Sequence, residues 1–247
     1  MTSERPPLIA LTGIQKHFGE PQPLVIRELT VRASDRLALP DLNTGAAEIL
    51  INLITGASLP EEGTVRVDGH DTRDIKTDTD WLTSLDRFGI VTARAVLIGP
   101  LPVAANLALP LTLTIDPMSA ETRAAVEALA ERVGLPASRL DAKASTLTPG
   151  EQVRVHLARA LAPEPQLVIL EHPTAAIRDE GEQRSLGEAL RHATEKTPTG
   201  WLALTGDRVF GRAAGATWMR IGADGNVRRE GFWSAVSSLP GLSGLLR

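Results

Sequence analysis

The sequence has no cysteine and no tyrosine, and aromatic residues make up only 3% of its 247 positions. Without cysteine the chain has no disulfide framework, no thiol nucleophile and no thiolate metal site, which fits a reducing compartment. Lysine is also rare, so arginine carries most of the positive charge. The net charge is −4 and the isoelectric point is near 5.8, which gives no reason to expect nucleic acid as a partner.

The sequence also lacks a long apolar run free of proline. The most apolar window, residues 95–113, contains Pro100, Pro102 and Pro110, which would break a lone membrane-spanning helix. We expect a buried irregular segment there, followed by a helix or a strand. The opening residues MTSERPP have no basic flank followed by an apolar core, so no signal peptide is predicted. The chain is therefore expected to be soluble by itself.

The remaining composition is that of a globular protein, with 43% hydrophobic and 23% charged residues. A chain of 247 residues predicts one large domain or a core with a sub-domain. Residues 167–170 and 201–204 are short, fully apolar segments, as expected of strands inside a parallel sheet. Because they alternate with helical patterns, the sequence predicts an α/β fold.

Shorter alternating segments predict further strands. Residues 8–11 and 24–31, separated by a turn, are typical of a small antiparallel sheet that leads into the core. Residues 64–67 alternate like a strand. Residues 219–221 and 226–228 surround an Ala-Asp-Gly turn and predict a terminal hairpin.

Helical signals concentrate between residues 119 and 194. Ser119 is the expected N-cap of an amphipathic helix that ends at Gly134. Thr148-Pro149-Gly150-Glu151 is a capping box with proline at the first helical position, so another helix is expected to begin there. Residues 185–194 predict a further helix.

Residues 41–56, DLNTGAAEILINLITG, follow a strand-like segment at 36–40 and lead into a helix predicted at 48–55. A phosphate-binding P-loop, G-x-x-x-x-G-K-[ST], belongs in such a strand–loop–helix context. Alignment on the helix assigns Asp41 to the first glycine, Ala46 to the second, Ala47 to the lysine and Glu48 to the serine or threonine.

The chemistry of a P-loop is missing from these positions. Ala47 brings no charge, Glu48 brings a negative one, and Gly45 is the glycine that the loop retains. A carboxylate in the first turn of a helix stabilises that helix by about 0.3–1 kcal/mol. We therefore expect Glu48 or Asp41 to occupy the anion site that phosphate would fill, and we expect no tight nucleotide binding.

Several motifs follow one another in order along the chain. They are KHFG at 16–19, the loop and helix at 41–56, EEGTVRVDG at 61–69, NLALPL at 106–111, LTPGEQVRVHLARAL at 147–161, EPQLVILEHPTAAI at 164–177 and LALTGD at 202–207. This series resembles the ATP-binding cassette (ABC) subunit of ABC transporters over nearly the whole chain, most specifically across residues 147–177.

The resemblance implies a single ABC ATPase-like domain over residues 1–247. Its α/β core would have the P-loop NTPase (RecA-like) fold, with an N-terminal antiparallel β sub-sheet, and would comprise residues 1–92 and 162–230. An α-helical signature sub-domain would be inserted at 93–161, and residues 231–247 would form a C-terminal tail.

The resemblance also implies roles for single positions. Phe18 matches the aromatic residue that stacks on adenine, and a core aromatic beside a turn accounts for it equally well. Ala93 replaces the Q-loop glutamine, and Gly206 replaces the switch histidine. Glu171 matches the Walker B carboxylate, and His172 replaces the glutamate that activates water.

His172 therefore has two interpretations. Its unperturbed pKa near 6.5 would allow it to act as a base. A base needs a positioned Mg²⁺-nucleotide, however, and Ala47, Glu48 and Ala93 lack the groups that position one. The favoured interpretation is a histidine at a strand end. We expect none of these vestigial positions to be catalytically competent and no metal to be held, so independent hydrolysis should be negligible.

The signature position keeps more of the family pattern. In this family the signature of one subunit faces the P-loop of the other across a head-to-tail dimer. Thr148 and Gly150 supply a hydroxyl and a glycine at a helix N-terminus able to point at phosphate. Pro149 replaces a glycine and Glu151 a glutamine. A partly competent signature and a well-capped structural helix are both consistent with this pattern.

Three hypotheses of function follow. The first is a degenerate, non-catalytic cassette that binds no cofactor tightly by itself and shares ATP and Mg²⁺, if at all, with a partner subunit. It would pair with a second ABC subunit, as a homodimer or heterodimer, and dock on a membrane permease through residues 93–106 at the cytoplasmic face. The second is an active ABC ATPase with a non-standard site, and the third is a soluble scaffold or regulatory protein.

Overall fold

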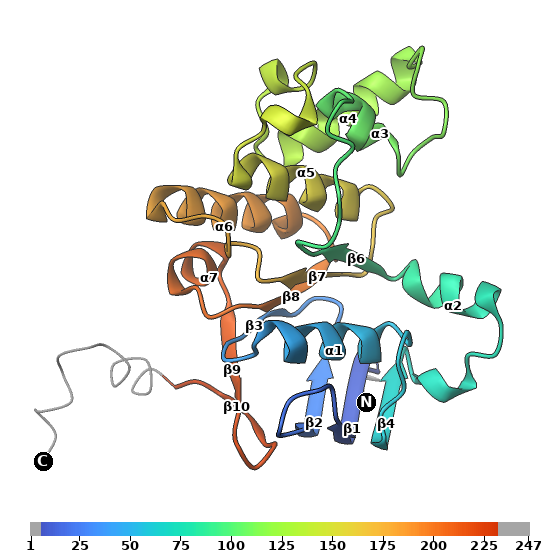
Figure 1. Ribbon diagram of the computed structural model, residues 1–247, viewed down its shortest axis with the longest axis vertical. Helices are drawn as coiled ribbons and strands as arrows, with labels where there is room; N and C mark the ends of the chain where they lie inside the picture. The colour runs from blue at the N-terminus through green and yellow to red at the C-terminus, as the bar shows by residue number, and fades with distance from the viewer. Residues whose placement is uncertain (1–5, 232–247) are drawn as a thin grey trace, which may run out of the picture.

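The computed structural model describes residues 6–231, which form two β-sheets with one helix between them and other helices beyond the larger sheet (Figure 1). The larger sheet has six strands and the smaller has four. The α/β class and the antiparallel sub-sheet are thus as predicted. Most of the predicted tail, residues 232–247, lies outside the described residues.

The six-stranded sheet has the strand order β10-β9-β3-β8-β7-β6. Strands β9, β3, β8, β7 and β6 run parallel, whereas β10 pairs antiparallel with β9. Strands β7 and β8 are buried along their whole length, as expected in a parallel sheet that is covered on both faces. The bounds are β3 (Arg36–Leu39), β6 (Phe88–Val91), β7 (Leu167–Glu171), β8 (Gly200–Leu204), β9 (Thr217–Ile221) and β10 (Val227–Arg229).

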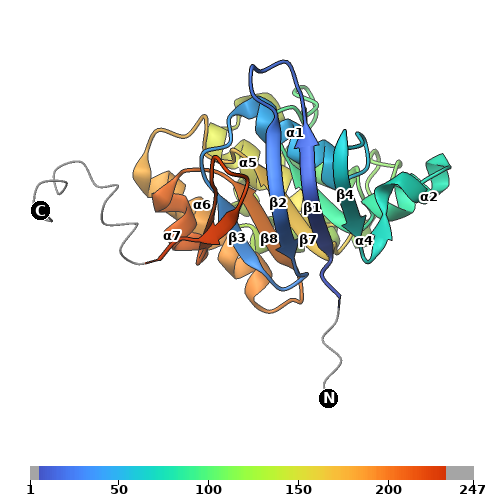
Figure 2. The ribbon, with the colours of Figure 1, turned by 90° about the horizontal axis from the view of Figure 1, so that it is seen from below.

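The four-stranded sheet is antiparallel, with the order β2-β1-β4-β5. Figure 2, which is seen from below, shows β2, β1 and β4 side by side in front of the larger sheet. Its bounds are β1 (Ile9–Lys16), β2 (Leu24–Val31), β4 (Glu62–Val67) and β5 (His70–Asp71). Strand β1 extends to Lys16 rather than ending at residue 11, because the polar residues after Leu11 still pair with β2 across the ladder.

Helix α1 (Thr44–Ile54) lies between the two sheets (Figure 1). Its residues Leu50, Leu53 and Ile54 are fully buried in one cluster with side chains from both sheets. Gly56 follows the C-cap with φ +72°, the left-handed conformation that favours glycine just after a helix end. Because both of its sides are covered, α1 fixes the loop that precedes it against the core.

The opposite face of the six-stranded sheet is covered by α5 (Pro149–Leu161), α6 (Glu180–Glu195) and α7 (Arg208–Ala214). Helices α3 (Val103–Ala108) and α4 (Ala120–Arg132) extend this layer to the end of the molecule farthest from the small sheet (Figure 1). Ser119 caps α4 and Gly134, with φ +68°, follows its C-cap, as predicted.

The predicted and observed helices differ where the helical residues are mostly polar. Helix α6 begins at Glu180 rather than at residue 185, because the Asp179 side chain accepts a hydrogen bond from the backbone N–H of Glu182 and caps it. Helix α2 (Asp78–Leu85) was not predicted. It buries no residue, so it has no apolar stripe for a sequence pattern to show.

Within residues 95–113 an irregular segment is followed by a helix, as predicted, but these residues are only partly buried, contrary to the prediction. Helix α3 within them is fully buried, but Val96 is 77% exposed and Leu113 is 93% exposed. The Asn106 side chain secures the segment, accepting a hydrogen bond from Ile98 N at 2.8 Å and donating one to Ile98 O at 3.1 Å. No helix described between residues 6 and 231 is long and apolar enough to cross a membrane.

Candidate functional site

The N-terminus of α1 is closed by the residue that precedes it. Asn43 is the N-cap, and its side-chain oxygen accepts a hydrogen bond from Ala46 N at 2.8 Å. Its backbone carbonyl accepts another from Ala47 N at 2.9 Å. The N–H of Ala46 is one of those that a helix N-terminus offers to a bound anion, whereas the bond from Ala47 is the first bond of the helix itself. In this chain the Ala46 N–H already has a partner within the protein.

The helix start predicted at Glu48 is therefore wrong, because the chain is already helical from Thr44. No acidic residue lies in the first turn of α1, so the expectation that Glu48 or Asp41 fills the anion site there is wrong as well. The physical reason is local. Asparagine is among the best N-caps, and the alanines at 46 and 47 favour helix where a P-loop would have glycine and lysine.

Asp41 instead joins a chain of ion pairs beyond β3. Its carboxylate lies 2.7 Å from the guanidinium of Arg220 on β9. Arg220 also contacts Glu230 at 3.0 Å, and Glu230 accepts two bonds from Arg208 at 2.7 and 3.0 Å. Hydrogen bonds from Arg208 and then Arg220 hold the pKa of Glu230 below its ordinary value, against burial. These contacts tie the loop after β3 to the end of β10.

Arg94, in the loop after β6, joins two carboxylates. Its guanidinium lies 2.8 Å from Glu48 Oε2 and 3.1 Å from Glu171 Oε2. The Thr92 hydroxyl donates a hydrogen bond to the same Glu171 oxygen. Glu171 is only 5% exposed, so its charge needs a partner within the protein. In the P-loop alignment, Glu48 and Glu171 stand at the positions that hold Mg²⁺, and here a guanidinium lies between them.

His172 follows β7 directly, at the strand end that one interpretation of the sequence predicts. Its φ is +42°, a conformation rare for residues other than glycine. Its backbone N–H donates to Leu204 O at 3.0 Å. The ring atom Nε2 is buried and has no hydrogen-bond partner in the described part of the chain.

The remaining predicted positions make no hydrogen bond or ion pair with these charged side chains within residues 6–231. The ring of Phe18 packs on the start of α1, since a Cβ added to Gly45 would lie 3.1 Å from Phe18 Cε2. Ala93 and Gly206 are exposed, and a Cβ added to Gly206 would meet nothing within 4 Å. Asp207, which follows it, is the N-cap of α7.

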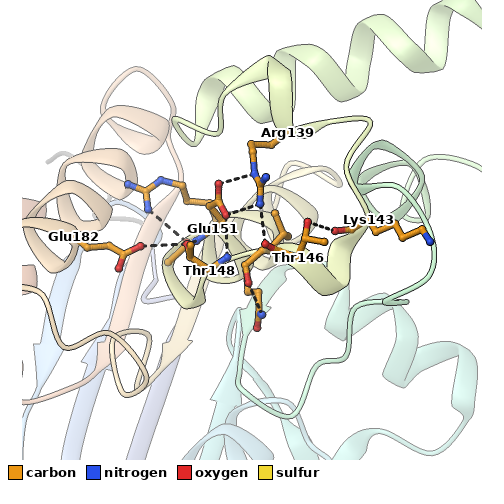
Figure 3. Close-up of polar contacts among 10 residues, drawn as sticks. Arg139, Lys143, Thr146, Thr148, Glu151 and Glu182 are labelled. Atoms are coloured by element: carbon orange, nitrogen blue, oxygen red, sulfur yellow. Dashed lines mark hydrogen bonds and ion pairs between the residues drawn. The ribbon is translucent and has the colours of Figure 1, made fainter.

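The predicted capping box is present at the N-terminus of α5 (Figure 3). Thr148 Oγ1 accepts a hydrogen bond from Glu151 N at 3.3 Å, and Thr148 N donates to Glu151 Oε2 at 2.9 Å. Arg139 contacts both carboxylate oxygens of Glu151, at 2.8 and 3.0 Å. Burial raises the pKa of Glu151, but the bonds from Thr148 and Arg139 outweigh burial and hold that pKa below its ordinary value.

A second carboxylate covers the same helix end. Glu182, in the first turn of α6, accepts a hydrogen bond of 3.5 Å from the Thr148 hydroxyl (Figure 3). A Cβ added to Gly150 would lie 2.0 Å from Glu182 Oε1, so this carboxylate rests on the Cα atom of Gly150. The N-terminus of α5 therefore already carries the negative charge that a helix dipole attracts.

The site residues form two groups within the chain. Asp41, Ala46, Ala47 and Glu48 belong to α1 and the loop before it, whereas Thr148, Gly150 and Glu151 begin α5. Figure 1 shows α1 and α5 on opposite faces of the six-stranded sheet, and they pack in different hydrophobic clusters. Arg94 is the residue that connects the first group to Glu171 at the end of β7.

Sequence reasoning missed Asn43, Arg94, Arg220 and Glu182. Asn43 had a local signal, since asparagine before a run of good helix formers predicts an N-cap. The other three act through contacts with residues far away in the sequence, and no spacing rule predicts such contacts. Within residues 6–231, no group of three or more His, Asp or Glu side chains could hold a metal ion.

Comparison with known sequences gives a consistent set of relatives. The profile of the family described as ABC transporter matches residues 49–175. The macrolide export ATP-binding/permease protein MacB 1 of Aeromonas hydrophila is 33% identical over 187 residues, which cover 74% of this chain and 28% of that protein. MacB of Bordetella avium is 31% identical over 177 residues, covering 69% and 26% respectively. The chain thus spans about a quarter of the length of these relatives.

Comparison with solved structures confirms the predicted fold class, a P-loop NTPase cassette. A dimeric post-hydrolysis state of the ATP-binding cassette MJ0796, bound to ADP and Pi, has a TM-score of 0.72 and 24% identity, over 90% of this chain and 97% of that one. CbiO1 from Clostridium perfringens, part of the transporter complex CbiONQ, has a TM-score of 0.71 and 17% identity, over 90% and 87%. At these identities the likeness concerns the fold alone. The predicted boundaries at residues 92 and 161 stay predictions.

Proposed function

The chain belongs to the ABC transporter family, and we propose that it is a cassette subunit that neither binds nor hydrolyses ATP at its own P-loop position. It acts in a transporter complex as the non-catalytic partner of a second cassette. The observation that carries this proposal is the guanidinium of Arg94 between Glu48 and Glu171.

Arg94 supplies the positive charge that Mg²⁺ would bring to these carboxylates. Glu171 is nearly fully buried, and the guanidinium and the Thr92 hydroxyl both bond to its Oε2 atom. A divalent cation would have to displace Arg94 before Glu48 and Glu171 could bind it. The residues present therefore do not fit a Mg²⁺-nucleotide, and no catalytic step through that group is derived.

The phosphate side of the site supports the same proposal. The Asn43 side chain engages the N–H group of Ala46, which leaves one donor fewer for a phosphate. Ala47 is fully buried, so the lysine position of the motif lies inside the core rather than over a phosphate site. Without a lysine at position 47, one main source of phosphate affinity is missing.

The partners follow from family membership. Relatives bear the names of ATP-binding/permease proteins, and a cassette of the same fold is part of a transporter complex. We assign the permease contact to residues 93–106, whose exposed residues lie between Ala93 and Pro102, since α3 beyond them is buried. Such a subunit would lie on the cytoplasmic face of the membrane, held there by its permease.

Two measurements test this function. Purified chain should show no steady ATP turnover above that of a heat-denatured sample, and an affinity-tagged chain should recover an integral membrane protein from membranes of its source cells. Mg²⁺-dependent turnover by the chain alone would overturn the proposal. Recovery of no integral protein would instead favour the soluble scaffold.

The competing function is an active ABC ATPase with a non-standard site. The observation that favours it is the retained end of β7, where the buried carboxylate of Glu171 is followed by His172, a residue able to accept a proton. On that account His172→Ala would reduce turnover by about 10²–10⁴-fold. On ours, the native chain and the variant are equally inactive.

A further inference from the structure

Strand β6 is the last strand of the six-stranded sheet on the side opposite β10 (Figure 1). It pairs in parallel with β7, and Leu167 N donates a hydrogen bond to Arg87 O at 3.1 Å. Because the backbone groups of a strand point alternately to its two sides, those of Gly89 face β7. The N–H and C=O groups of Phe88 and Ile90 therefore point away from the sheet, along its open edge.

The edge of β6 lacks the features that commonly protect the edge of a sheet. Charged side chains, proline and bulges keep other strands from pairing at such an edge. Residues Phe88–Val91 contain no charge and no proline, and their register with β7 has no bulge. At the opposite edge, β10 carries Arg228 and Arg229. An apolar edge strand of this kind is a template for a strand of another chain.

A cavity of about 330 Å³ lies against this strand. Phe88, Gly89 and Ile90 form one wall of the cavity, and the last turns of α5 form another. Ala160 approaches the strand closely, since a Cβ added to Gly89 would lie 2.3 Å from Ala160 O. Further apolar lining comes from Leu85, Ala95, Pro110 and Pro163. The side chains of an added strand would therefore find apolar space beside β6.

Arg159, in the last turn of α5, gives this cavity a positive charge. Its partly buried side chain donates a long hydrogen bond of 3.4 Å to Val96 O and forms no ion pair with residues 6–231. Burial lowers the pKa of the Arg159 guanidinium, because the charge has lost part of its hydration. No aspartate or glutamate of the described chain lines the cavity, so a carboxylate of the occupant would complement Arg159.

We propose that the edge of β6 binds an extended segment of a partner protein, and that an aspartate or glutamate of this segment pairs with Arg159. The segment adds a strand to the sheet, and its backbone bonds to the outward groups of Phe88 and Ile90. A second copy of this chain, paired through its own β6, fits less well, because that strand has no carboxylate to offer Arg159. The proposal goes beyond the proposed function, since it requires neither the presence nor the absence of a nucleotide.

Isothermal titration calorimetry of the full chain with synthetic peptides tests this site. The probe is the capped hexapeptide Val-Thr-Val-Glu-Val-Thr, compared with two forms that are N-methylated at alternate residues. An added strand turns only every second N–H toward β6. One methylated form should therefore bind at least about tenfold more weakly, and the other should bind as the probe does. Equal binding of the two methylated forms, or no binding of the probe up to millimolar concentration, would overturn the proposal.

Charge reversal locates the peptide at Arg159. The variant Arg159→Glu should bind the probe at least about tenfold more weakly, and it should bind a probe with lysine in place of glutamate better than the native chain does. The matched control is Arg184→Glu, at an exposed position of α6 outside the lining, which should leave binding of the probe unchanged. Equal binding of the probe to Arg159→Glu and to the native chain would contradict the assignment.

The variant Ile90→Pro removes the outward N–H of residue 90 and keeps the bonds to β7, which Gly89 and Val91 make. Proline is tolerated at such a position of an edge strand, so probe binding should be lost while the circular dichroism spectrum stays native. If this variant unfolds, the methylated probes still decide on the native chain. Sedimentation velocity tests the other occupant: a native dimer that Ile90→Pro dissociates would assign the edge to a second copy and overturn the proposal.

Discussion

At the scale of single residues, Arg94 has the largest consequences for this cassette. Its side chain is 44% exposed and the side chain of Glu48 is 45% exposed. An ion pair between two such exposed side chains contributes little stability. Its second contact differs, because Glu171 is 5% exposed and a buried charge without a partner is strongly unfavourable. Arg94 thus stabilises a carboxylate that the fold has kept at the end of β7.

Replacing Arg94 with methionine should leave Glu48 and Glu171 facing each other without a cation. We expect the free energy of unfolding, measured by urea denaturation, to fall by about 1–3 kcal/mol, the cost of a buried group that loses its partner. Millimolar Mn²⁺ should restore much of this loss, because two carboxylates and the Thr92 hydroxyl are ligands that such a cation accepts.

The matched control is the double variant Glu48→Gln/Arg94→Met. It keeps one carboxylate, Glu171, and should therefore gain no stability from Mn²⁺. A recovery of Arg94→Met by NaCl at the same ionic strength would show general screening and would contradict a cation site between the carboxylates.

Ala47 tests whether the phosphate side of the site can be rebuilt. Because Ala47 is fully buried in the core around α1, Ala47→Lys should lower the unfolding free energy by about 2–4 kcal/mol, through overpacking and a buried charge. The control Ala128→Lys, on the exposed side of α4, should change it by less than about 0.5 kcal/mol. Unchanged stability and new ATP binding in Ala47→Lys would show a P-loop that is intact except for its lysine.

At the scale of elements, the N-terminus of α5 keeps the capped helix start of the signature motif but carries added negative charge, because Glu151 stands where the family has glutamine. The capping box of Thr148 and Glu151 satisfies the first N–H groups of the helix. Glu182 then places a second carboxylate over Gly150. On our account a partner's phosphate is repelled at this end, so the partner's nucleotide site receives no help from this chain.

The variant Glu151→Gln removes the negative charge but keeps the capping hydrogen bond, because the glutamine oxygen can still accept it from Thr148 N. The pKa of Glu151 is lowered in the folded protein. Its charge therefore stabilises the fold above the unfolded pKa, and this stability is lost as pH falls through the folded pKa. We expect Glu151→Gln to cost about 0.5–1 kcal/mol at neutral pH and less near pH 3, where the carboxyl group takes up a proton. Urea denaturation at both pH values measures this; an equal cost at both would contradict it.

Elements with local signals could be predicted from the sequence. A short local pattern is enough to predict the buried strands β7 and β8 and the helix caps Ser119 and Thr148, because each depends only on neighbouring residues. Helix α2, which buries nothing, and the polar first turns of α6 have no such pattern. The bridge between Glu48 and Glu171 could not be predicted, since Arg94 reaches them only after β6, β7 and α1 have assembled.

At the scale of the whole molecule, exposed apolar side chains flank α3. Val96, Ile98, Leu111 and Leu113 are 77%, 45%, 40% and 93% exposed. Large exposed apolar side chains close together in the sequence often mark an interaction surface. Val96 and Ile98 belong to the segment that we assign to the permease, and Leu111 and Leu113 follow it in the sequence.

The double variant Val96→Ser/Leu113→Ser should leave the unfolding free energy within about 0.5 kcal/mol of native, since neither side chain is buried. It should nevertheless abolish recovery of the integral membrane partner in an affinity pull-down. Leu82→Ser on α2, where leucine is 56% exposed, is the matched control and should not affect recovery. Equal recovery with the double variant would remove this surface from the proposed interface.

On our account, a guanidinium and an early helix start take the place of the nucleotide in this cassette. Isothermal titration calorimetry of the chain with ATP tests this most directly. The titration is carried out once with Mg²⁺ present and once with Mg²⁺ removed by a chelator. We predict no measurable heat of binding at up to millimolar ATP in either condition. Micromolar binding that disappears when Mg²⁺ is removed would contradict the account.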